Sequence, residues 1–169
     1  VTMSGTLTVN AGSTLALGAL NLYATGTTIT NNGTMVEDTG KIVHSGSALL
    51  VANSDYAATA NIDAGDTIYY TLTDSDENLD GTAADTVTVT ASAGGGDSET
   101  VTLTETGNAT GIFRGSITSV NQAASVGNGT IDASVSTFVQ VLYIDAQDAL
   151  QNVDEATYTV AAATTTTTS

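Results

Sequence analysis

From about residue 55 onward, apolar and polar side chains alternate in a series of short segments. Val101 and Leu103 alternate with threonines in one segment, and Val87 and Val89 do the same in another. A period of two puts alternate side chains on opposite faces of a strand, so each segment predicts a strand with one buried face. The predicted strands cover residues 66–73, 85–92, 99–105, 111–118, 137–144 and 156–160.

About six or seven such strands, separated by turn residues such as Gly94–Gly96, are typical of a β-sandwich. No stretch has a convincing helical period. The all-β sandwich is assigned to residues 53–160. The side chains expected in or near its core are Ile68, Tyr70, Leu72, Val87, Val89, Val101, Leu103, Ile112, Ile117, Val139, Val141 and Tyr143.

Residues 1–52 have a different pattern and are predicted to form an N-terminal extension. Gly or Asn-Gly interrupts short alternating segments, as at Gly12, Gly26, Gly33 and Gly40. These residues permit the turns that join short strands. Two structures fit this Gly-rich pattern: a short β-solenoid of a few rungs, or strands that pair with another chain. Either structure leaves strand edges unpaired, and such edges recruit further strands.

The last nine residues, 161–169, are a low-complexity Thr tail. A spacer or a continuation of the last strand is the preferred interpretation. An O-glycosylated stretch, or a strand added to a neighbouring molecule, would fit the same composition.

Composition narrows the class of protein. Hydrophobic residues make up 41% of the 169 positions, which is enough for a core. Cysteine is absent, which excludes disulfides, zinc-thiolate sites and thiol nucleophiles. The chain begins at Val1, and no apolar run is long enough to span a bilayer. We therefore expect an exported protein whose export signal has been removed.

The charge is strongly one-sided. Eighteen acidic residues face two basic ones, Lys41 and Arg114, for a formal net charge of −16. Such a surface repels nucleic acid and anionic membranes, so neither is expected as a partner. The acidic residues either keep an exposed protein soluble or include ligands for a divalent cation.

Several phrases in the central segment resemble a known repeat. They are Ala64–Asp80, Asp85–Thr90, Asp97–Gly107, Thr110–Ile117 and Tyr143–Ala149. Their ordered succession is similar to an immunoglobulin-like repeat of large prokaryotic surface proteins, of the adhesin and surface-layer type. The resemblance covers roughly residues 55–160 and implies an immunoglobulin-like β-sandwich at the cell surface. In that family the units stand in tandem, whereas here one unit follows a Gly-rich segment.

The acidic segment between the first two strands of the sandwich is a candidate calcium loop. Asp74, Asp76, Asn78 and Asp80 alternate along the chain before Gly81, and Asp85 follows. Calcium takes six to eight oxygen ligands, which such a curved loop can direct inward. The match to an EF-hand is partial, because the Gly lies two places late and Asp85 stands where Glu is usual. The alternative is a solvated acidic turn.

A second acidic loop precedes the last strand. It contains Asp145, Asp148 and Asp154, with Asn152 and Glu155 beside them, and is a weaker candidate for calcium. It could meet the first loop at one end of the sandwich.

Catalytic patterns are weak, and we expect that the protein is not an enzyme. His44 is the sole histidine, and no activated-serine motif lies near it. Aromatic residues are 5% of the chain and tryptophan is absent, which disfavours a sugar-cleaving cleft. Three sequons, at Asn32, Asn108 and Asn128, are candidate glycosylation sites.

Together these features predict a structural subunit of an extracellular filament or surface lattice. Copies would assemble by β-strand complementation, with an N-terminal segment of one copy completing a sheet edge of the next. The alternative is a monomeric adhesive or carbohydrate-binding module, with a surface glycan or a receptor on a neighbouring cell as its partner. The candidate assembly residues are Leu7, Val9, Leu15, Leu17, Leu20, Leu22, Ile42, Val43, Leu49 and Leu50.

Overall fold

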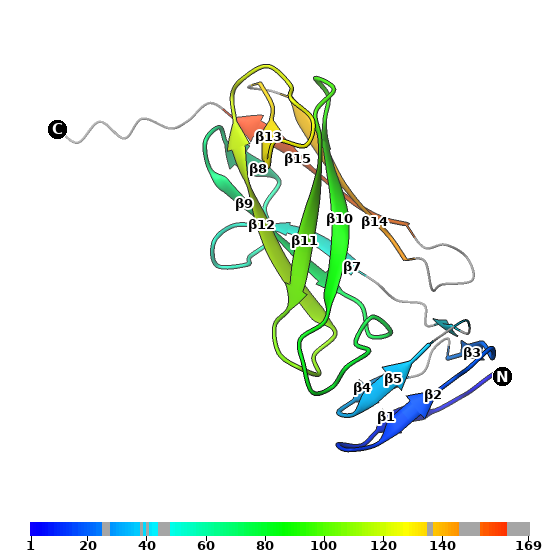
Figure 1. Cartoon of the computed structure of the whole chain (residues 1–169). Helices are drawn as coiled ribbons and strands as arrows, with labels where there is room; N and C mark the ends of the chain where they lie inside the picture. Colours follow the sequence, from blue (N-terminus) through cyan, green and yellow to red (C-terminus); the bar gives the residue numbers. More distant parts are fainter. Residues whose placement is uncertain are drawn as a thin grey trace.

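The computed structural model describes residues 1–24, 28–37, 39, 41–43, 48–134, 137–145 and 153–161. All regular elements in these ranges are strands, which confirms the all-β prediction. A unit of short strands near the N-terminus lies at one end of a larger, curled sheet (Figure 1). Among the described residues, no helix is long and apolar enough to cross a membrane.

The N-terminal unit consists of six short strands in two successive turns of chain. The first turn holds β1 (Thr6–Val9), β2 (Thr14–Ala16) and β3 (Leu22–Tyr23). The second holds β4 (Thr28–Asn31), β5 (Thr34–Val36) and β6 (Ile42–Val43). We call these turns the first coil and the second coil, and β1 to β6 together the coil unit.

Each strand of the first coil pairs in parallel with its counterpart in the second. Thr6 pairs with Thr28, Thr14 with Thr34 and Leu22 with Ile42, so partners are 20 to 22 positions apart. Three parallel ladders with nearly the same spacing are the geometry of two stacked rungs. Val9, Met35 and Ile42 form the buried centre of the coil unit.

The larger sheet has nine strands and is curled into a half-barrel. Its hydrogen-bond order is β7-β9-β12-β11-β10-β14-β15-β8, with β13 paired to β12. Most pairs are antiparallel, but β8 with β15 and β13 with β12 are parallel, so the sheet is mixed. The strands are β7 (Ala48–Ala52), β8 (Asn61–Asp63), β9 (Thr67–Thr73), β10 (Thr86–Ala93), β11 (Ser98–Glu105), β12 (Ile112–Val120), β13 (Thr130–Asp132), β14 (Phe138–Ile144) and β15 (Val153–Ala161).

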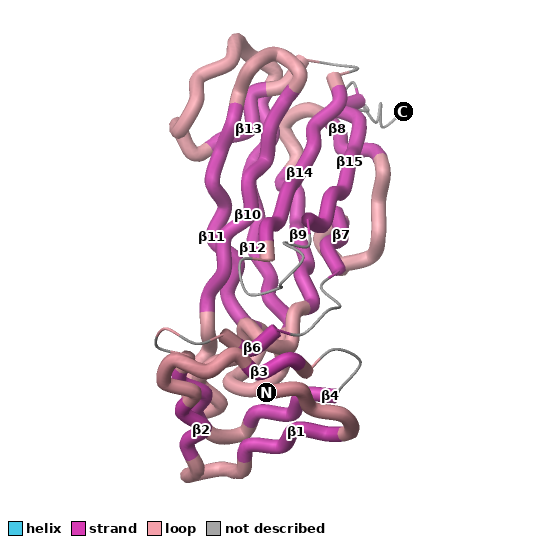
Figure 2. Tube along the Cα trace, turned by 90° about the vertical axis from the view of Figure 1, so that its right-hand side faces the viewer, coloured by secondary structure: helices cyan, strands magenta, loops and turns pink. Residues whose placement is uncertain are grey.

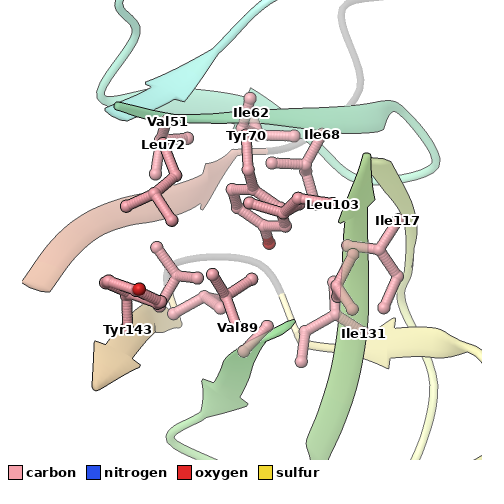
Figure 3. Close-up of a cluster of buried hydrophobic side chains, with 14 of the residues drawn as sticks. Val51, Ile62, Ile68, Tyr70, Leu72, Val89, Leu103, Ile117, Ile131 and Tyr143 are labelled. Carbon is pink, nitrogen blue, oxygen red and sulfur yellow. The ribbon is translucent and has the colours of Figure 1, made fainter. Parts of the chain in front are cut away.

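The inner surface of the curl is the main hydrophobic core (Figure 3). Along β11 the burial pattern alternates strictly, with Val101 and Leu103 inside and threonines outside, as the period of two predicts. Eleven of the twelve predicted core side chains are buried. The twelfth prediction, Ile112, is wrong. Because side chains alternate along β12, Phe113 and Ile117 point inward and Ile112 is only half-buried.

Three strands of the larger sheet were not among the predicted strands of the sandwich. β8 and β13 have three residues each, too few to show a period. β7 lies within residues 1–52, the predicted extension, yet it hydrogen-bonds to β9 along its whole length. The immunoglobulin-like sandwich stays a prediction, since the described strands from β7 to β15 form one continuous curled sheet.

Gly33 tests how tightly the two coils are stacked. A Cβ on Gly33 would collide with the backbone oxygen of Ser13 and lie 2.5 Å from that of Asn10. We expect Gly33→Ala to destabilise the coil unit by about 1–3 kcal/mol, the range for overpacking. Hydrogen exchange at the amides of Asn32 and Thr34, which donate to Val9 and Ser13 of the first coil, measures the effect.

Gly95→Ala is the matched control, because a Cβ there would meet no heavy atom within 4 Å. It should leave exchange in the coil unit unchanged. Equal exchange in both variants would contradict the tight stacking of the coils.

Candidate metal centre

The connection between β9 and β10, residues 74–85, lies where the larger sheet meets the coil unit (Figure 2). We call it the acidic loop. Its first residues follow β9 and turn back toward the sheet, because the amide of Asp74 donates to the carbonyl of Gly111. Its later residues contact the second coil, where Thr34 and Asp80 form an antiparallel bridge.

Three carboxylates meet at the root of this loop. Asp74 and Asp76 come from the acidic loop and Asp145 follows β14, and one oxygen from each lies within 4.8 Å of the others. All three side chains are buried, at 1%, 0% and 0% exposure. Opposite ligands of a calcium ion are about 4.8 Å apart, because each calcium–oxygen bond is about 2.4 Å. The cluster could therefore hold a metal ion such as calcium.

Buried carboxylates need a counter-charge, since an isolated ion costs several kcal/mol to bury. The two basic side chains of the protein are engaged elsewhere. Lys41 pairs with Glu37 at 3.1 Å, and Arg114 lies over the ring of Tyr56. Bound protons or a metal cation can balance the charge of the cluster.

The raised pKa values of Asp76 and Glu77 reflect the cost of burying these carboxylates. Burial, followed by the hydrogen bond and charge of Asp74 and the charge of Asp145, raises the pKa of Asp76 to about 10. Burial and the charges of Asp74, Asp145 and Glu37 raise the pKa of Glu77 to about 7. A bound divalent cation would reverse this preference, because it favours the ionised carboxylates.

Tyr143 supports the cluster from the sheet. Its hydroxyl donates to Oδ2 of Asp74 at 2.7 Å and lies 3.5 Å from Oε1 of Glu77. Its ring lies in the main core, next to Val89 (Figure 3). Burial and the charges of Asp74 and Glu77 raise the pKa of Tyr143, so the hydroxyl stays protonated and keeps donating. A cavity of about 230 Å³ is lined by Glu77, Thr86 and Tyr143.

The other predicted ligands of the acidic loop, Asn78, Asp80 and Asp85, are not part of the carboxylate cluster. Asp85 accepts the backbone amides of Leu79 and Asp80 through Oδ2, at 2.7 and 2.8 Å, and so closes the loop. Asp80 accepts from the amide and hydroxyl of Thr82, which lower its pKa. Asn78 is buried at 4% exposure, and its Oδ1 has no hydrogen-bond partner among the described residues.

Asn78 also ties the loop to the second coil. Nδ2 of Asn31 donates to the carbonyl of Asn78 at 2.7 Å, and Nδ2 of Asn78 lies 3.4 Å from the carbonyl of Asn31. The amide of Met35 donates to the carbonyl of Leu79 at 2.5 Å, and Leu79 packs on the core of the coil unit. The acidic loop thus caps the second coil.

In the second predicted loop, Asp145 joins the cluster, as the expected meeting of the two loops requires. Asp148, like His44, lies outside the described residues, and the side chain of Asp154 in β15 does too. Two contributors were not predicted as site residues, Glu77 and Tyr143. Tyr143 lies two positions before Asp145, on the same face of the strand, which is a signal that could have identified it.

The glycosylation candidates lie at the surface. Asn32, Asn108 and Asn128 are all exposed. The amide nitrogens of Asn108 and Asn128 already donate, to the carbonyl of Thr82 at 2.8 Å and to Asp132 at 2.9 Å. A glycan on either nitrogen would compete with that bond.

The assembly candidates lie mostly inside the coil unit. Val9, Leu22 and Ile42 are buried there, whereas Leu20 is 62% exposed. Leu7, Leu15, Leu17 and Leu49 are half-buried, and the side chains of Val43 and Leu50 lie outside the described set.

No protein-family model and no curated protein matches the sequence.

Calcium should stabilise the protein through the cluster. At a hundredfold excess over Kd, we expect a gain of about 2.7 kcal/mol, or roughly 5–10 °C in Tm. Asp76→Asn should abolish this gain and, in chelator, be about as stable as the original chain, because the raised pKa already keeps Asp76 protonated and uncharged when no metal is bound. Calorimetry in calcium and in chelator measures both effects, with exposed Asp66→Asn as control. A full calcium response in Asp76→Asn would contradict the site.

Without metal, stability should fall as pH rises. The folded chain holds the proton of Glu77 up to about pH 7, whereas the unfolded chain loses it near 4.5. The stabilisation from this proton is therefore complete below pH 4.5 and is lost as pH rises through about 7.

Urea unfolding in chelator, at about pH 5 and about pH 8, measures the decline. Glu77→Gln should reduce it, because that side chain cannot ionise. The same decline in Glu77→Gln and the original chain would exclude Glu77 as its source.

Proposed function

We propose that this chain is a structural subunit of an extracellular filament or surface lattice, in which copies join by strand pairing. The observation that carries the proposal is the open end of the coil unit. Within the described residues, β1 and β2 each pair with one strand only, in the second coil. Their other edges present backbone groups that a further strand can satisfy.

At one position the open end already pairs with a further segment, which comes from the N-terminus of the same chain. Residues 1–3 lie beside β3, where Thr2 and Tyr23 form a parallel bridge and the amide of Met3 donates to the carbonyl of Tyr23 at 2.8 Å. The separation of Thr2 from Tyr23, 21 positions, repeats the spacing of the two coils. A strand from another molecule could extend β1 and β2 in the same way.

A groove at this end would fix the register of that strand. It has a volume of about 180 Å³ and is lined by Leu7, Val9 and Leu15, with Thr8 and Thr14 at its sides. In an added strand, alternate side chains point the same way, so one apolar side chain can fill the groove while its neighbours face water.

Charge favours a second copy of this chain as the partner. Residues 1–36 contain no charged side chain, so all eighteen acidic residues lie from Glu37 onward. Like-charge repulsion between two chains of net charge −16 is therefore weakest at the open end.

The coil unit acts as acceptor in this proposal. Val9 and Ile42 are buried within their own chain, so donating these segments to a neighbour would require the coil unit to open. An acceptor at the coil end and a donor elsewhere make the contact heterologous, which propagates into an open chain of subunits. The resemblance of residues 55–160 to an immunoglobulin-like repeat of prokaryotic surface proteins supports an extracellular place and an immunoglobulin-like sandwich.

Lysines on the open edge test the assembly. Thr8 and Thr14 are exposed on β1 and β2, and charged side chains on an edge strand oppose pairing. Negative-stain microscopy and light scattering of the Thr8→Lys/Thr14→Lys variant should show monomers, whereas the original chain forms filaments or sheets.

Thr102→Lys/Thr104→Lys is the matched control, with the same change in charge on β11, which has a strand on each side. It should assemble normally. Discrete dimers of the original chain would indicate a closed end-to-end contact and contradict a filament. Monomers under all conditions would favour the alternative, a monomeric adhesive or carbohydrate-binding module.

A further inference from the structure

A polar cleft lies at the other end of the larger sheet, away from the metal centre and the coil unit. It is formed by the β7–β8 connection, β8 and the start of β9, and has a volume of about 400 Å³. Its walls carry the amides of Asn53 and Asn61, the hydroxyl of Thr67 and the carboxylate of Asp66, with Ile62 and Tyr69 beside them. Asn61, Asp66 and Thr67 are exposed, so their polar groups are accessible to a ligand.

The aromatic residue that lines this cleft is Tyr69, and its neighbour Tyr56 has an unusual backbone conformation. Tyr56 has φ 57°, and it is the sole described residue other than glycine with a positive φ. A bulky side chain rarely adopts this conformation, and residues that do so cluster at binding sites. The turn is held by Asn53, whose Oδ1 accepts the amides of Asp55 and Ala57 at 3.0 and 3.1 Å.

This strained turn places Tyr56 against Tyr69. The two rings meet edge to face, with centroids 5.4 Å apart. The guanidinium carbon of Arg114 lies 3.9 Å from the centre of the Tyr56 ring. The single arginine of the chain thus fixes Tyr56, and Tyr56 in turn buttresses Tyr69 at the cleft.

We propose that this cleft binds a neutral saccharide. A sugar ring combines hydroxyls, which both donate and accept, with an apolar face of C–H groups. Amide, hydroxyl and carboxylate side chains match the hydroxyls, and the half-buried ring of Tyr69 matches the apolar face. The lining includes Asp66 and no basic side chain, and the chain has net charge −16, so sulfated or uronic sugars are repelled. This inference does not depend on assembly, because the cleft and the open end of the coil unit share no residue.

Saturation-transfer NMR on the full chain tests the inference. The probes are the methyl glycosides of glucose, mannose and galactose, N-acetylglucosamine, and glucuronate as the anionic comparison. We expect transfer to at least one neutral sugar and none to glucuronate. Asn61→Ala and Asp66→Ala should each weaken binding by about tenfold, the loss expected for one polar contact.

Asn121→Ala is the control, since Asn121 is an exposed asparagine outside the cleft. It should bind as the original chain does. Transfer to none of the neutral sugars would overturn the inference. Transfer that is unchanged in both cleft variants, or stronger for glucuronate than for the neutral sugars, would overturn it as well.

Discussion

Burial of like charges at the junction of the sheet and the coil unit is the constraint on which the other features depend. Asp74, Asp76 and Asp145 lie together out of contact with water, and Glu77 lies close by. Lys41 and Arg114 have other partners, and bound protons or a cation can neutralise this centre. Asp74 and Asp76 lie at the start of the acidic loop, and Leu79 and Gly81, a few residues later in the same loop, contact the second coil. A Cβ on Gly81 would collide with Asn32 and Gly33, so the approach is close.

The two ends of the coil unit therefore differ. The second coil is closed by the acidic loop, which supplies backbone partners to Gly33 and Met35. The first coil keeps open edges on β1 and β2 and an apolar groove, in the one long stretch of the chain without charged side chains. A solenoid end that is capped on one side and open on the other is suited to directional, head-to-tail assembly. In the proposed assembly, a cation bound at the metal centre would not touch the contact between copies. It would instead hold the capped end of the coil unit rigid.

Local pattern predicted much of the sheet, and long-range pairing could not be predicted. Alternation of Val and Leu with Thr gave β10 and β11, and a looser apolar alternation gave β9 and β14. These strands supply most of the core, whereas Ile112 was misplaced by one position in a strand interrupted by Gly115. The Gly-rich pattern of residues 1–52 fits either a short β-solenoid or strands that pair with another chain. It could not decide between them, because the parallel ladders of the coil unit join residues about twenty positions apart. In the metal centre, alternation along one loop indicated Asp74 and Asp76. Asp80 and Asp85, however, accept hydrogen bonds from neighbouring groups, and the third carboxylate, Asp145, comes from a distant strand end.

Hydrogen exchange at the capped end, in calcium and in chelator, tests the central claim most directly: the metal centre and the cap form one unit. The amide of Met35 donates to Leu79 across the junction, and that of Gly81 donates to Gly33. Calcium should slow exchange at both amides, while the amide of Val89, deep in β10, changes little. If calcium binds and neither junction amide is slowed, the acidic loop does not couple the metal centre to the coil unit, and the account is wrong.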